Sequence, residues 1–118
     1  MSGTQLIARE RRRQVRVEKY FPRHDDGHTD CSLAIAAACY AAPVPIFYCE
    51  HGLNRVVFLD PWPWPAEDKR ERWIDGKLKA PDALTTKRRI RDLVKAGALI
   101  AAEIDRLQRA ARRRKAKP

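Results

Sequence analysis

Cysteine is scarce and irregularly placed in this sequence of 118 residues. Its three cysteines, Cys31, Cys39 and Cys49, are an odd number and contain no C-x-x-C pair. This spacing argues against a disulfide framework and for a reducing compartment. We therefore expect the three thiols to be free and buried as small apolar side chains.

Long apolar runs are also missing. The longest run, Leu33 to Ala42, is too short to span a bilayer. No apolar run follows the first charges of the N-terminus, as a secretory signal would require. We expect a cytoplasmic protein that makes no membrane contact.

The familiar enzyme motifs are absent. The sequence has no P-loop, no G-x-G-x-x-G, no H-E-x-x-H and no G-x-S-x-G. No Cys or His pair has a recognised metal-ligand spacing, and we expect neither a metal nor a cofactor. The sequence favours a binding protein, although the absence of these motifs does not exclude an enzyme.

Positive charge is what the sequence has in excess. Twenty-five lysines and arginines against fifteen acidic residues give a formal net charge of +10. A basic surface of this strength favours nucleic acid, nucleotides or acidic proteins as partners. We expect one domain over residues 1–112 and a disordered basic tail over residues 113–118. The predicted nucleic-acid contacts are Arg112, Arg113, Arg114 and Lys115.

The pattern of apolar residues predicts a mainly α fold with a three-helix core. The expected helices are Thr4–Lys19, with Thr4 as its cap, Leu33–Ala42, capped by Asp30, and a long last helix from Thr85 or Thr86 to about Arg112. The second helix is apolar on every side, which indicates burial. Pro22–Asp30 is expected to be a loop.

The middle of the chain is expected to be less regular. β-branched and aromatic residues around Gly52 predict a short hairpin within Val44–Asp60, which must lie on the helices or pair with another chain. Residues 61–65 (PWPWP) cannot be helical, so they form an extended segment. A short helix over Ala66–Ile74 and a linker over Lys77–Pro81 should follow.

Further predictions follow from the residues along one side of the first helix and along one side of the last helix. On the first helix, Glu10 and Gln14 interrupt a stripe that begins at Ile7 and continues through Val17 and Phe21, so they lie at a groove or are buried with partners. On the last helix, alternating spacings of four and three form a seam for another helix. This seam predicts a homo-oligomer, and its residues are Leu93, Gly97, Ile100, Ile104, Leu107 and Ala111.

Three clusters could bind a ligand. The loop over residues 24–28 (HDDGH) could hold a polar ligand or a metal, or its side chains could serve the turn alone. The two tryptophans could stack on a base or cover the core, with one ring on each side of the segment. Arg88, Arg91 and Lys95 could meet phosphate near the start of the last helix or form a solvated basic face. The candidate ligand residues are Arg13, Gln14, His24, Asp26, His28, Trp62, Trp64, Arg91 and Lys95.

Most of the chain outside the hairpin and the tail resembles a group of small uncharacterised proteins of bacteriophages and prophages. The resemblance lies in residues 10–14 (ERRRQ), 24–28 (HDDGH), 36–41 (AAACYA), 62–64 (WPW), 91–100 (RDLVKAGALI) and 102–107 (AEIDRL). The group has no established activity, so this resemblance implies a host-cell cytoplasmic location and a phage origin but no reaction.

A fainter resemblance concerns the opening R-x-R-Q over residues 11–14, followed by His24-Asp25 and an apolar helix. This order is similar to the MazG-like all-α nucleotide pyrophosphohydrolases, which hold magnesium through acidic residues on that helix. Here Leu33–Ala42 contains no carboxylate. The resemblance therefore implies a nucleotide-shaped pocket without the hydrolytic activity.

The leading hypothesis is a non-enzymatic phage-encoded protein that binds a nucleotide or another small phosphorylated ligand and so removes a host defence signal. A basic inhibitor that binds nucleic acid or a host protein is the alternative. A MazG-like nucleotide pyrophosphohydrolase with displaced acids is the third. A concave site that gathers the candidate residues would favour the first, and a flat basic face the second.

Overall fold

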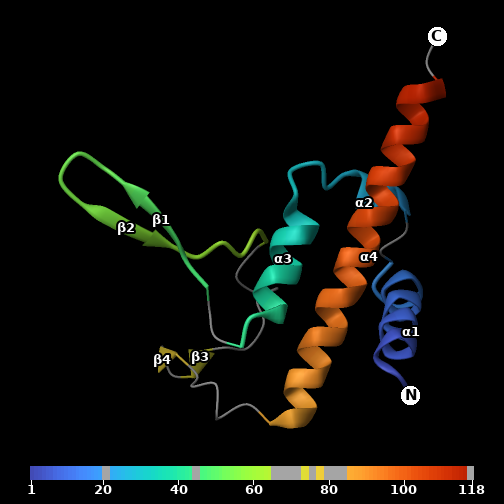
Figure 1. The fold of residues 1–118 in the computed structure, drawn as a ribbon, viewed down its shortest axis with the longest axis horizontal. Coiled ribbons are helices and arrows are strands. Elements are labelled where there is room, and N and C mark those ends of the chain that lie inside the picture. The colour runs from blue at the N-terminus through green and yellow to red at the C-terminus, as the bar shows by residue number, and fades with distance from the viewer. Residues whose placement is uncertain (20–21, 44–45, 65–72, 75–76, 79–84, 117–118) are drawn as a thin grey trace.

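The computed structural model describes residues 1–19, 22–43, 46–64, 73–74, 77–78 and 85–116. The described part is mainly helical, which confirms the predicted fold class. The long helix α4 (Thr86–Ala116) lies in the middle, with α1 (Gly3–Arg16) on one side and α3 (Ser32–Ala41) on the other (Figure 1). A short helix, α2 (Pro22–Asp26), also packs against α4.

Helix α1 forms where it is predicted, but its cap is Ser2 and not Thr4. The Ser2 hydroxyl accepts a hydrogen bond from the Gln5 backbone, and the Gln5 side chain accepts one from the Ser2 backbone. This reciprocal pair is a capping box. The helix ends at Arg16, and Val17 is left exposed. The expected inward position of Val17 was therefore wrong, and Phe21 lies outside the described residues.

The predicted loop over Pro22–Asp30 contains helix α2, so the expectation of a loop alone was wrong. Proline is well suited to the first position of a helix, because it needs no backbone donor there. Asp25 is almost fully buried, and Arg11 donates to its Oδ2 at 2.6 Å. This buried ion pair ties α2 to α1.

The N-cap of helix α3 is Cys31, whose side chain makes no capping bond, so the prediction of Asp30 as the cap was wrong. Asp30 lies one residue earlier, and its Oδ1 accepts a hydrogen bond from the Ser32 backbone at 3.2 Å. Its burial is one-sided: Ala34, Ile35 and Ala38 are exposed, so the prediction of burial on every side was wrong. The core lies between α3, α4 and the tryptophan segment. It consists of Leu33, Ala36, Ala37, Cys39, Trp62, Ala96, Leu99 and Ala102. Of the cysteines, only Cys39 is buried, and the exposure of Cys31 and Cys49 corrects the expectation for them.

Helix α4 begins as predicted, with Thr85 Oγ1 accepting from the Arg88 backbone at 3.1 Å. It continues to Ala116, beyond the predicted end at Arg112. The disordered tail expected from residue 113 is therefore helical over residues 113–116, while 117–118 lie outside the described residues. Arg109 and Arg113 both donate to Asp26, which explains part of this extension.

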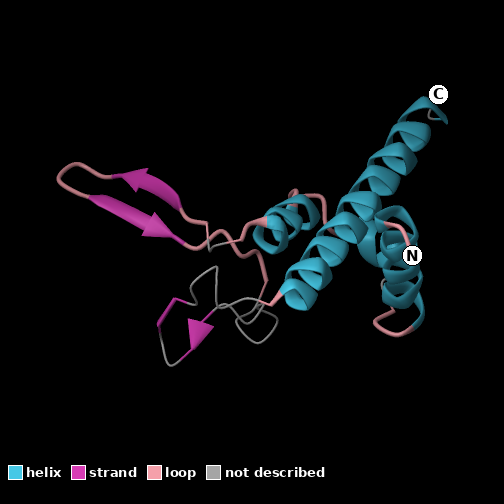
Figure 2. Cartoon of the chain, turned by 60° about the horizontal axis from the view of Figure 1, so that its bottom comes forward, coloured by secondary structure: helices cyan, strands magenta, loops and turns pink. Residues whose placement is uncertain are grey.

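The hairpin predicted within Val44–Asp60 is confirmed. Strands β1 (Tyr48–His51) and β2 (Val56–Leu59) pair antiparallel, and the Gly52 backbone donates to Arg55 O at 2.8 Å. The hairpin extends away from the helices instead of lying on them (Figures 1 and 2). A second pair, β3 (Trp73–Ile74) with β4 (Lys77–Leu78), replaces the end of the predicted short helix and the start of the predicted linker. The rest of both predictions lies outside the described residues.

Candidate functional site

Several of the candidate ligand residues lie around one small cavity between α1, α3 and α4. Arg13, Gln14, Trp64 and Lys95 line it together with Tyr40. These residues come from widely separated parts of the chain, and the sequence analysis predicted that they belong to one ligand site. The volume of the cavity is about 60 Å³. A water molecule occupies about 30 Å³ of liquid, so the cavity can hold two waters or one polar group of a larger ligand.

Two buried polar atoms of the cavity residues lack hydrogen-bond partners in the described part of the chain. Gln14 is 4% exposed, and its Oε1 accepts no hydrogen bond there. The Nε1 of Trp64 likewise donates none. Buried polar atoms in proteins almost always have a partner. A polar group that enters this cavity would supply both atoms with one.

A row of contacting aromatic side chains connects this cavity to the HDDGH loop. The ring centroids of His28 and Trp64 are 5.7 Å apart, and those of His24 and His28 are 4.8 Å apart. Trp62 contacts Trp64 at 5.4 Å between centroids and is itself buried against Tyr40. The two tryptophans therefore lie on the same side of the segment, which corrects the expected alternation. Trp62 covers the core, and Trp64 faces the cavity.

The Lys95 ammonium lies 5.5 Å from the centroid of the Tyr40 ring, a cation–π distance. Burial, together with the positive charge of Arg91, lowers the pKa of Lys95. Both effects disfavour its charged form. An anionic group near Lys95 would reverse the second of these effects and would be attracted to the site.

Glu10 stands between Arg13 and Arg91 and is 3% exposed. Arg13 Nε donates to both of its carboxylate oxygens at 2.9 Å, and Arg91 NH1 donates to Oε2 at 2.6 Å. Burial by itself would raise the pKa of Glu10, but the hydrogen bonds from Arg13 and Arg91 outweigh it and lower the pKa. Of the two alternatives predicted for Glu10, the structure shows burial with partners.

A larger groove lies on the other side of this ion-pair cluster, between α1 and the first turns of α4. Its volume is about 820 Å³. Leu6, Ile90 and Val94 give it an apolar lining, and Glu10 is its single carboxylate. The groove and the small cavity share Glu10 and Arg13, so they meet at the ion-pair cluster. The cations that line the groove are Arg9, Arg13, Lys87, Arg88 and Arg91.

Arg9 and Lys87 were missing from the sequence prediction, and Arg88 was placed on the basic face but not among the ligand residues. Helical spacing could have found Arg9 and Lys87, since Arg9 is four residues before Arg13 and Lys87 is four residues before Arg91. The crossing of α1 and α4 is what brings the two groups together. That crossing depends on tertiary packing and leaves no local pattern in the sequence.

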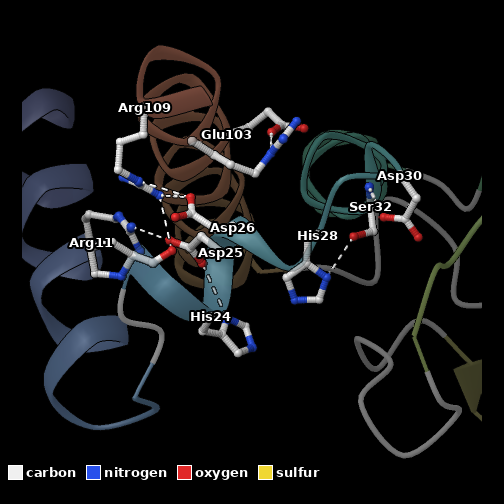
Figure 3. Close-up of polar contacts among 11 residues, drawn as sticks. Arg11, His24, Asp25, Asp26, His28, Asp30, Ser32, Glu103 and Arg109 are labelled. Carbon is white, nitrogen blue, oxygen red and sulfur yellow. Dashed lines mark hydrogen bonds and ion pairs between the residues drawn. The ribbon is translucent and has the colours of Figure 1, made fainter. Parts of the chain in front are cut away.

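Other predicted site residues lie elsewhere. Asp26 binds Arg109 and Arg113 and is not part of either hollow (Figure 3). The hydrogen bond from Arg109 is the largest influence on its carboxyl group and lowers the pKa of Asp26. Arg112, Arg114 and Lys115 are exposed on the last turns of α4. Arg113 is paired with Asp26, so the four basic residues do not act as one unpaired cluster.

The rest of the HDDGH loop is occupied by internal contacts (Figure 3). Asp25 binds Arg11, and His24 Nδ1 lies 3.4 Å from Asp25 Oδ1. His28 Nδ1 is 3.0 Å from Ser32 Oγ. Within the described ranges, no group of three or more His, Cys, Asp or Glu side chains is arranged to hold a metal ion.

No protein-family model, curated protein or solved structure matches the chain. Among the helices that the structure describes, none has both the length and the apolar content required to cross a membrane. The geometry of the groove and of the cavity is therefore the basis for assigning a function.

Proposed function

We propose that this protein binds a nucleotide or another small phosphorylated ligand in the groove between α1 and α4, and holds it without chemical change. The observation that carries the proposal is the convergence of five cations, Arg9, Arg13, Lys87, Arg88 and Arg91, on one groove with a single carboxylate. The phosphates would bind these side chains. Retention of a nucleotide signal, with no product released, is the biological role that suits such a site.

The size and the lining of the groove support a ligand of this class. Its 820 Å³ lies within the range of about 300–1,000 Å³ that is typical of small-molecule sites. The apolar surface of Leu6, Ile90 and Val94 suits the face of a base or sugar. The adjoining cavity offers the unpaired acceptor of Gln14 and the unpaired donor of Trp64 to one polar edge of the ligand.

Hydrolysis of the MazG type has less support. It requires carboxylates on the helix that follows the HDDGH loop, and Ser32–Ala41 contains none. The nearest carboxylate to the groove is Glu10, which is bound by two arginines and is poorly placed to hold a cation. We therefore propose that the protein binds the ligand and does not hydrolyse it.

The alternative is a nucleic-acid or acidic-protein partner, and one observation favours it. Arg112, Arg114 and Lys115 are exposed at one end of α4, while the groove lies near the other end. A long polyanion could contact both regions, whereas a nucleotide would contact the groove alone. The salt dependence of binding separates the two, because each additional phosphate contact steepens it.

The first test removes cations from the groove. Arg9→Ala and Lys87→Ala should each weaken the binding of a nucleoside triphosphate by about tenfold, or roughly 1.4 kcal/mol. Neither side chain takes part in the ion pairs found among the described residues, so both variants should keep the melting temperature of the parent protein. Isothermal titration calorimetry against a set of nucleotides measures the effect.

The matched controls are Arg12→Ala and Arg112→Ala, which remove the same charge from exposed positions outside the groove. Their affinity for the nucleotide should stay within about twofold of the parent value, the range of a screened surface charge. If all four variants weaken binding equally, the attraction comes from net charge, and the assignment of the groove is wrong.

A second prediction concerns the cavity. Gln14→Leu replaces a buried acceptor that has no hydrogen-bond partner among the described residues by an apolar side chain of similar size. Removing an unsatisfied buried polar atom should preserve or raise the free energy of unfolding, while the ligand loses about 1 kcal/mol of binding. Chemical denaturation and calorimetry on the same sample give both quantities. A loss of stability with unchanged affinity would assign Gln14 to the core.

A further inference from the structure

The charged side chains around the small cavity are mostly bound to one another. Glu10 and Glu18 line it, and both carboxylates accept hydrogen bonds from Arg13. Three other polar groups of the lining make no hydrogen bond or ion pair with another described residue. They are the acceptor Gln14 Oε1, the donor Trp64 Nε1 and the Lys95 ammonium. The cavity therefore presents two donors and one acceptor to a group that enters it.

These three groups are held in place before a ligand arrives. The Trp64 ring packs edge-on against Trp62, with 5.4 Å between the centroids. The Lys95 ammonium lies 5.5 Å from the centroid of the Tyr40 ring, and Gln14 is buried on α1. Packing thus fixes where the two donors and the acceptor lie. A site whose polar groups are fixed in advance can distinguish ligands by their hydrogen-bonding pattern.

The pattern of the cavity matches the lactam edge of a nucleic-acid base, in which a carbonyl group adjoins a ring N–H. The carbonyl oxygen has two lone pairs, so it can accept from both Trp64 and Lys95 while the N–H donates to Gln14. Adenine and cytosine instead place an amino group beside a ring nitrogen that has one lone pair. Either of these edges would leave one of the two protein donors without an acceptor, which costs binding free energy.

The size and position of the cavity fit an edge and not a whole ring. Its volume of about 60 Å³ is that of two water molecules, or of one carbonyl and one N–H group. The ring itself would lie outside, over Arg13, which is partly exposed and lines both the cavity and the groove. A planar guanidinium group stacks well on an aromatic ring. A nucleotide could therefore extend from the cavity across Arg13 into the groove.

We infer that the cavity binds the lactam edge of a base, so that the ligand is a guanine, hypoxanthine or uracil nucleotide and not an adenine or cytosine nucleotide. This inference rests on the proposed function and names the base of the ligand. The groove holds the phosphates, which all nucleotides share, and the cavity selects among the bases.

Calorimetry of the full chain with five nucleoside triphosphates tests the inference. The triphosphates of guanosine, inosine and uridine should bind at least about tenfold more tightly than those of adenosine and cytidine, or roughly 1.4 kcal/mol. All five carry the same phosphates, so the comparison isolates the base. Inosine has the lactam edge of guanosine without its amino group, and its tight binding would assign the preference to that edge.

The possible failures are distinct. Equal affinities for all five triphosphates would show that water fills the cavity; the inference would be overturned and the proposed function would stand. Tighter binding of adenosine or cytidine triphosphate would overturn the inference in the same way. If no nucleotide binds, the proposed function and the inference are both wrong.

Two variants test whether the cavity is the source of the preference. Gln14→Met removes the acceptor, and Trp64→Phe removes the N–H donor and keeps an aromatic ring. Each should lower the ratio of guanosine to adenosine triphosphate affinity by about fivefold, the scale of one lost hydrogen bond. If Trp64→Phe lowers the melting temperature, Gln14→Met alone decides the result. A ratio that survives Gln14→Met would overturn the inference.

The controls separate the base from the phosphates. Gln108→Met is the matched control, because Gln108 is an exposed glutamine on α4 outside both hollows. It should leave the ratio of the two affinities unchanged. Arg9→Ala, in the groove, should lower both affinities equally and so also preserve the ratio. A change of ratio in either control would show that the preference does not come from the cavity.

Discussion

Replacing Glu10 by glutamine should lower the free energy of unfolding by about 2 kcal/mol, the scale of losing charged hydrogen bonds at a buried carboxylate. The same change should tighten the binding of a phosphorylated ligand by about fivefold, or roughly 1 kcal/mol. The two effects have one cause. Glu10 engages the guanidinium groups of Arg13 and Arg91 and neutralises part of the groove. Denaturant titration and calorimetry measure the two quantities.

Glu18→Gln is the matched control for this variant. Glu18 also accepts from Arg13, at 2.5 Å, but it is a surface carboxylate. Its loss should change the stability by no more than about 0.5 kcal/mol, the usual worth of an exposed ion pair. If Glu10→Gln instead weakens ligand binding, Glu10 orders the arginines for the ligand and does not compete with it.

The pH dependence gives an independent check on Glu10. Its folded-state pKa lies below the ordinary value of 4.5, so the ionised form stabilises the fold. That contribution is complete above about pH 4.5 and is lost as the pH falls through the folded-state pKa. The stability difference between the parent protein and Glu10→Gln should therefore shrink progressively below pH 4.5. An unchanged difference at low pH would show that the carboxyl acts through packing alone.

Replacing Gly97 by leucine should destabilise the fold by about 2 kcal/mol, in spite of a gain of about 1 kcal/mol in helix propensity. A Cβ at this position would lie 2.5 Å from Ile7 Cδ1 and 2.8 Å from Ile7 Cγ1. Isoleucine is stiff about χ1 on a helix, so α1 must move as a body. Thermal and chemical unfolding of the variant and of the parent protein, compared at the same concentration, measure the effect.

A double variant shows whether the clash is the cause. Ile7→Ala should recover at least about 1 kcal/mol of the loss when it is combined with Gly97→Leu, a coupling typical of residues in contact. Gly3→Leu serves as the control, since a Cβ at Gly3 meets no atom within 4 Å. Additive losses in the double variant would rule out the contact with Ile7 as the source of the strain.

The sequence could predict the helices because their signals are local. Pro43 follows the end of α3, and Thr85 precedes α4 as its cap. The buried polar positions of α1 could also be found, since Glu10 and Gln14 share one helical face. Helix α2 was missed because its five residues carry no apolar repeat. Its stability comes from the contacts of Asp25 and Asp26 with distant arginines.

Part of the candidate site could also be predicted from local features of the sequence. Gln14, Trp64 and Lys95 stand out as residue types that are unusual for their positions, and the structure places them together. The groove itself could not be predicted, because it is the space left between two crossing helices. No pattern along the chain shows how closely α1 approaches α4, although Gly97 marks one point of approach.

The central position of α4 has a consequence for how the chain is made. Helices α1, α2 and α3 each pack chiefly against α4, and α4 is the last of the four in the sequence. Translation proceeds at about 5–20 residues per second, so the first three helices must wait several seconds for the surface that buries them. Isolated helices of this length are marginal in water. The chain should therefore remain protease-sensitive on the ribosome and fold in one step only after α4 has emerged.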